Sequence, residues 1–231
     1  MSDTNNPHRH EYLTRFIDDE SKIFLRRFYN KHIGLSTQES VDQLIGQNRT
    51  NVKRMSVIFR SVRPDAGVDE VRKFVLENSP VAAKLSDKAL QQMYEGYGPE
   101  KFNLNDRRYS ASIHPIELWL VEYLRRYPQA ELREVAVASH NARHEAYSWL
   151  WKTRHKGAQD KRILTLIEEQ AFDEVYEAWK RQGFPFRSIV PSYATALGSS
   201  GDNPAALAEL VGILINDGVR YPTRRIESLE V

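Results

Sequence analysis

Three histidines, His140, His144 and His155, have a spacing that could bind a metal ion. His140 and His144 stand four residues apart, so a helix would present both side chains on one face, and His155 follows eleven residues later. A zinc-protease helix has a glutamate directly after its first histidine, but this chain has Asn141 there. The sequence therefore favours ordinary polar positions on a helix, and we predict neither a metal site nor a cofactor.

A basic stretch follows these histidines. It runs from residue 152 to 162 and contains Lys152, Arg154, Lys156, Lys161 and Arg162, interrupted by Asp160. Such a stretch could contact phosphates, since lysine and arginine neutralise a nucleic-acid backbone. The formal net charge of the whole chain is only +2, however, and the other arginine pairs are scattered. We therefore expect a solvated helix face and no nucleic-acid partner.

The composition is that of an ordinary globular protein. The chain has 231 residues, of which 41% are hydrophobic and 28% charged, and a chain of this length can bury roughly 70–75% of its unfolded surface. It contains no cysteine, which excludes disulfides and thiolate metal sites. Residues 1–10 lack the apolar core of a signal peptide, and no apolar stretch approaches the ~20 residues of a membrane span. We expect no targeting signal and no membrane span.

Helical patterns fill the first half of the chain. They predict helices over residues 11–33, over a segment that begins at Ser36, and over residues 52–62, 69–77 and 87–94. Ser36 is followed three residues later by Glu39, which is the spacing of a capping box. The turn-rich span Gly96–Asp106 is the best boundary candidate. We therefore predict a helical accessory or inserted region over 1–106 and a second region over 107–231.

Two further helices are expected in the middle of the chain. One has Pro115 in its first turn and ends before Pro128, and its apolar positions are Ile116, Trp119, Leu120 and Tyr123. The next begins near Ala130 and leads into Ser139-His140-Asn141. Ser139 and Asn141 could be plain polar residues on the face of that helix.

The clearest helix lies near the C-terminus. Asn203 can cap it and Pro204 suits its first position. Leu207, Leu210, Val211 and Leu214 share one face, while Ile213 and Ile215 lie outside that stripe, so the helix is apolar nearly all round and is predicted to be buried. After Gly218 the chain is expected to become extended around Pro222, with Ile226 and Leu229 as its apolar positions.

Segments of the second half resemble the transpeptidase region of class A penicillin-binding proteins, the bifunctional transglycosylase/transpeptidase enzymes of the bacterial cell wall. Leu197-Gly198-Ser199-Ser200, with Pro204 four residues on, resembles the family's Pro-Ser-x-x-Leu-Gly-Ser-Ser loop, which precedes a helix and then a strand of the central sheet. Leu132-Arg133-Glu134 with Ser139-His140-Asn141 resembles its Leu-Arg-Glu-Ala-Leu-x-x-Ser-x-Asn segment. The stretch from Phe172 to Pro185 resembles the approach to the loop. The resemblance covers about residues 113–226.

The resemblance implies a D,D-transpeptidase that cross-links peptidoglycan. In that family a Ser-x-x-Lys serine attacks a D-alanyl-D-alanine stem peptide, and a Lys-Thr/Ser-Gly strand lines the acyl site. By this resemblance Ser139 would help to shuttle the proton, and Asn141 would hydrogen-bond the substrate or the lysine. The partners would be the stem peptide and the remainder of the transpeptidase domain, and the parent enzyme would work at the periplasmic face of the inner membrane.

Two of the three family motifs are missing from this sequence. Ser148 is followed by Lys152, one residue too far for Ser-x-x-Lys, and Lys152-Thr153-Arg154 has arginine where the third motif has glycine. We therefore expect a mainly α chain, a helical fragment of an α/β transpeptidase domain with at most a short C-terminal strand or two, and no activity by itself. The alternative is a non-enzymatic helical protein-interaction module.

Overall fold

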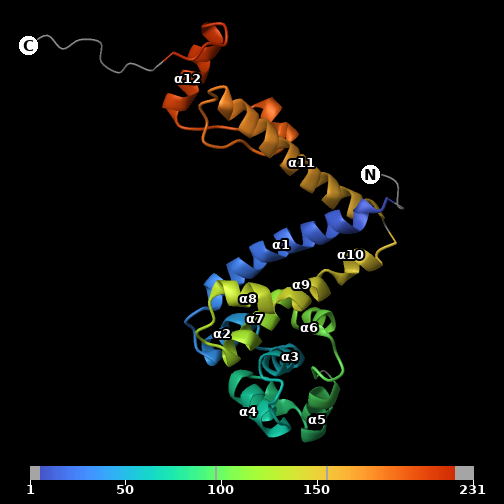
Figure 1. Cartoon of the computed structure of the whole chain (residues 1–231). Helices are drawn as coiled ribbons and strands as arrows, with labels where there is room; N and C mark the ends of the chain where they lie inside the picture. Colours follow the sequence, from blue (N-terminus) through green and yellow to red (C-terminus); the bar gives the residue numbers. More distant parts are fainter. Residues whose placement is uncertain (1–5, 97, 155, 222–231) are drawn as a thin grey trace, which may run out of the picture. The chain divides into compact units, whose positions relative to one another are not determined.

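The computed structural model describes residues 6–96, 98–154 and 156–221, and these form two compact units (Figure 1). One unit comprises residues 13–155, and the other combines residues 1–12 with 156–231. The first helix, α1 (His8–His32), contributes to both. No strand lies within the described ranges, which confirms a mainly α chain. The extended segment expected around Pro222 falls almost entirely outside the described residues.

Helices make up almost all of the unit formed by residues 13–155. After α1 these are α2 (Thr37–Ile45), α3 (Val52–Val62), α4 (Val68–Asn78), the short 3₁₀ helix η1 (Ala82–Lys84), α5 (Asp87–Gly96), α6 (Leu104–Ala111), α7 (Pro115–Arg126), α8 (Leu132–Ala138), α9 (His140–Ala146) and α10 (Ser148–Lys152). Serine and glutamate form the predicted capping box at the start of α2: Ser36 Oγ accepts from the Glu39 N–H at 3.2 Å, and Glu39 accepts from the Ser36 N–H at 2.8 Å.

The main core of this unit surrounds α3. This helix packs against α2, α4, α6 and α7, and Met55, Ile58 and Val62 on it are completely buried. Phe59 of α3 stacks on Phe74 of α4 with ring centroids 4.2 Å apart. The large apolar residues of α3 fill this core, and the helix also buries Ser56, Arg60 and Ser61. Since α6 packs on α3, this unit is continuous through the span Gly96–Asp106; the division into regions 1–106 and 107–231 stays a prediction.

A second core joins the later part of α1 to α7 and α8. Leu25 of α1 lies with Ile116 and Leu120 of α7 and with Val135 of α8, and all four side chains are buried. The apolar face predicted for α7 is therefore the face that packs inward. This core brings α1 beside the helices that carry Ser139 and Asn141, although about 110 residues of chain lie between them.

The other unit contains α11 (Lys156–Arg181), the 3₁₀ helix η2 (Tyr193–Leu197) and α12 (Pro204–Ile215). Arg9 attaches the first residues of α1 to α11 by an ion pair to Asp160 (2.7 Å) and a hydrogen bond to Gln159 (2.7 Å). Asn203 caps α12 by accepting from the Ala206 N–H at 2.9 Å, and Pro204 occupies the first turn, as predicted.

The predicted burial of α12 is wrong for this chain. Ala206 is its one buried residue, while Leu210 and Ile213 are half-buried. Leu207, Val211, Leu214 and Ile215 are 44%, 52%, 70% and 73% exposed. The described residues cover α12 on one side only, so three of the four positions of its predicted stripe face solvent.

Candidate functional site

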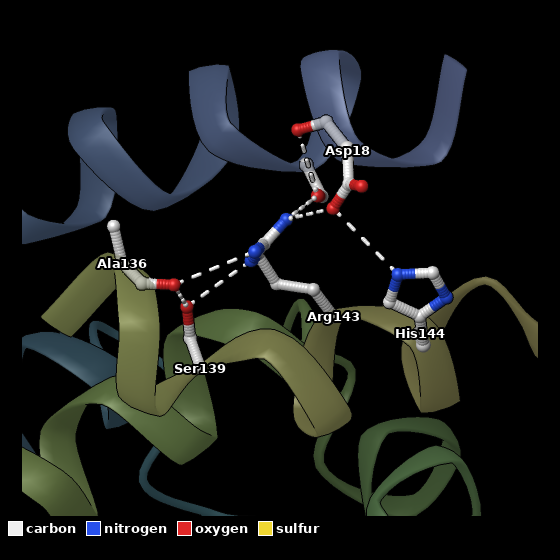
Figure 2. Close-up of polar contacts among 6 residues, drawn as sticks. Asp18, Ala136, Ser139, Arg143 and His144 are labelled. Carbon is white, nitrogen blue, oxygen red and sulfur yellow. Dashed lines mark hydrogen bonds and ion pairs between the residues drawn. The ribbon is translucent and has the colours of Figure 1, made fainter. Parts of the chain in front are cut away.

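Ser139 lies where α8 ends and α9 begins, and it is completely buried. Its hydroxyl donates to the carbonyl oxygen of Ala136 at 3.1 Å and accepts from Nε of Arg143 at 3.1 Å (Figure 2). Its backbone continues the helical hydrogen bonds on both sides, to Val135 and from Arg143. In this arrangement the hydroxyl has no path to a solvent-borne substrate, and it stabilises the junction of two helices.

Arg143 is the centre of this cluster. Its side chain is 3% exposed, and the guanidinium donates to Asp18 Oδ1 and to Ser21 Oγ, both at 2.9 Å. Burial by itself would raise the pKa of Asp18, but the hydrogen bond and the charge of Arg143 lower it below its ordinary value. A buried charge is tolerated only when it is paired and hydrogen-bonded, and Asp18, Ser21 and Ser139 provide these partners from α1 and from the α8–α9 junction.

The two histidines of α9 lie at the edge of this cluster. His140 and His144 have ring centroids 4.4 Å apart, and His144 Nε2 is 3.6 Å from Asp18 Oδ1 (Figure 2). Burial and the neighbouring His140 lower the pKa of His144, against the opposing effect of Asp18. The net effect favours the neutral form of His144.

Asn141 is exposed and lies in a different environment from Ser139. It borders a groove of about 380 Å³ in the same unit. The groove is lined by Ser61, Pro64, Pro99, Leu104, Arg107, Trp119, Glu122, Arg126, Asn141, Ala142 and Glu145. Ser139 is not among these residues, so the structure does not bring the two predicted site residues together, and their catalytic roles stay predictions.

The groove combines one aromatic wall with charges of both signs. Burial lowers the pKa of Arg107, while the charges of Glu145 and Glu122 act in the opposite direction. Glu145 also accepts from the backbone N–H of Leu104 at 2.8 Å, which ties α9 to the start of α6. An aromatic side chain, an amide and charged groups of both signs can contact the polar and apolar parts of a peptide.

Sequence reasoning missed Asp18, Arg143 and Arg107. Asp18 and Arg143 are 125 residues apart, and neither stands in a motif. Two local signals pointed to this area: the pair of histidines four residues apart, which predicts a shared helix face, and the Ser139-His140-Asn141 segment.

The chain has no match among models of known protein families, among curated proteins or among solved structures. A membrane-spanning helix is also absent from the described ranges, because none of their helices combines the necessary length with the necessary hydropathy.

Proposed function

We propose that this chain is part of a peptidoglycan-crosslinking D,D-transpeptidase of the penicillin-binding type, in which it supplies packing and peptide-facing surface rather than the nucleophile. The observation that carries this proposal is α12. Its capped start after the Leu197–Ser200 loop agrees with the family resemblance, and three of the four positions of its apolar stripe, Leu207, Val211 and Leu214, are exposed.

Burial of the exposed apolar residues of α12 by a partner would be energetically favourable. Single exposed apolar residues are common on protein surfaces, but Leu207, Val211 and Leu214 are contiguous on one helix face. Complete burial of each such side chain is worth roughly 1.5–3 kcal/mol. In the proposed assembly the remainder of the transpeptidase domain covers this face, since in the family the corresponding helix precedes a strand of the central sheet.

The groove beside Asn141 is the surface that would meet the stem peptide in this proposal. Arg107 could pair with the carboxylate of the peptide, while Arg126 is already paired with Glu122, and Trp119 could contact the apolar part. The parent enzyme would then act at the periplasmic face of the inner membrane. These assignments depend on the family resemblance and on the residues that line the groove.

Labelling with a fluorescent penicillin tests the proposal. The 231-residue chain should not be labelled, because it lacks a Ser-x-x-Lys serine and an unactivated hydroxyl is a weak nucleophile. The product of the complete reading frame around this chain should be labelled on a serine outside it, and Asn141→Ala should reduce that labelling about 100-fold. Absence of labelling in the longer product would reject the transpeptidase.

A non-enzymatic interaction module is the second candidate. The burial of Ser139 favours it, because a hydroxyl held by Ala136 and Arg143 is not free to transfer protons. The two candidates share the exposed face of α12 and differ in penicillin labelling of the longer product. Unaltered labelling after both Ser139→Ala and Asn141→Ala would leave the interaction module as the role of this chain.

A further inference from the structure

We propose that Asp18, His140 and His144 form a binding site for a divalent transition-metal ion such as Zn²⁺. One possible ligand atom from each of these three side chains lies within 4.8 Å of the other two. Two imidazoles and a carboxylate are a common ligand set for such an ion in proteins. The site is independent of the proposed transpeptidase function.

The distance between His144 and Asp18 is close to the distance between two ligands of a bound zinc ion, so only a small movement of the side chains is needed. Zinc–ligand bonds of about 2.0–2.1 Å place two ligands of a tetrahedral ion about 3.4 Å apart. His144 Nε2 already lies 3.6 Å from Asp18 Oδ1. The third ligand, His140, is exposed on the same helix face, so rotation of its side chain can complete the set and the ion can enter from solvent.

His144 provides a second, independent observation. Its Nε2 atom is buried and lies 3.6 Å from Asp18 Oδ1, beyond the length of a normal hydrogen bond. Buried polar atoms normally have a closer partner, so this gap between an imidazole nitrogen and a carboxylate oxygen is unusual. A metal ion between His144 and Asp18 would satisfy both groups (Figure 2).

Arg143 would act as the support of the carboxylate ligand. It donates to Asp18 Oδ1 at 2.9 Å and thereby fixes the orientation of the Asp18 carboxylate. Ligating carboxylates are commonly held by such outer hydrogen bonds. The positive charges of Arg143 and Lys22 beside Asp18 also reduce the attraction for a cation. We therefore expect weaker binding than in zinc sites with thiolate ligands.

Calorimetric titration of the full chain with Zn²⁺ at pH 7.5 tests the site. We expect one ion per chain at this site, with affinity reduced at least tenfold by each of His140→Asn, His144→Asn and Asp18→Asn. Asp19→Asn and His8→Asn are the matched controls, because they remove an exposed carboxylate beside Asp18 and an exposed histidine elsewhere. Both controls should bind as the unaltered chain does.

A second measurement keeps the test valid if a variant loses its fold. Imidazole NMR signals of the unaltered chain should show that Zn²⁺ shifts His140 and His144 and leaves His8 in place. Binding that is unchanged in Asp18→Asn but lost in the histidine variants would indicate a two-histidine surface contact and would overturn the three-ligand site. Equal binding by all variants, or no shift of the two signals, would overturn it as well.

Discussion

α3 and α12 are similar in length and are both rich in large apolar residues, yet their surroundings differ. Met55, Ile58 and Val62 of α3 are enclosed by α2, α4, α6 and α7, whereas Leu214 of α12 is 70% exposed. An apolar helix therefore indicates a need for cover without showing that the same chain provides it. The comparison identifies α12 as the part of the described chain that most needs a partner.

Replacing one apolar residue in each helix should give the largest difference in the free energy of unfolding. Ile58→Ala should lower the free energy of unfolding by about 3 kcal/mol, because it leaves a cavity in a closed core. Leu214→Ala should change it by less than about 0.5 kcal/mol, because little burial is lost. Urea denaturation of both variants measures the contrast. Equal losses would mean that α12 is buried in solution.

The Ser-x-Asn pair gives a second contrast, between a buried and an exposed member. Ser139→Ala should cost about 1–3 kcal/mol, because it leaves the buried Nε of Arg143 without its acceptor. Asn141→Ala should cost less than about 0.5 kcal/mol, because this side chain borders an open groove. Thermal unfolding measures both. A Ser139→Ala variant as stable as the unaltered chain would contradict the buried hydrogen bonds.

Local sequence patterns predicted most of the helices and their ends. The burial of individual residues depends on contacts between distant segments, which these patterns do not show. The capping box at Ser36, the cap at Asn203 and the inward face of α7 all follow from residues a few positions apart. Ser139 is held by Arg143, which Asp18 and Ser21 of α1 contact in turn, and the exposure of α12 depends on which surfaces lie next to it. The spacing of residues along a helix contains no information about either neighbour.

The N-cap of α7 gives a smaller, pH-dependent contrast. His114 Nδ1 accepts from the Ile116 N–H at 3.3 Å, and its ring stacks on Phe24 at 4.9 Å. Burial, together with the charge of Arg108, lowers the pKa of His114 from 6.5 to about 4. Protonation would remove the acceptor, so the folded state holds this side chain neutral.

Acid should destabilise the folded state, because His114 has a higher pKa in the unfolded state and is therefore protonated there at a higher pH. The contribution of His114 to stability is complete above pH 6.5 and is lost as the pH falls toward 4. For a half-buried group we expect a loss of about 1–2 kcal/mol across this window. In His114→Asn, which retains a capping side chain, the free energy of unfolding should fall less over the same range. Urea denaturation at several pH values measures both slopes, and equal slopes would contradict the assignment.

The exposed stripe of α12 can be tested directly with a cysteine, because the chain contains none. Leu214→Cys should react rapidly with a thiol reagent in the 231-residue chain and, if the proposed assembly is correct, at least tenfold more slowly when the proposed partner domain is present. Ile23→Cys on α1, exposed by 66%, is the control and should react at the same rate with and without that domain. Peptide mass spectrometry measures each rate. Protection of Leu214→Cys alone in the presence of that domain is the result that we predict, and equal rates for Leu214→Cys with and without it would contradict a covered α12.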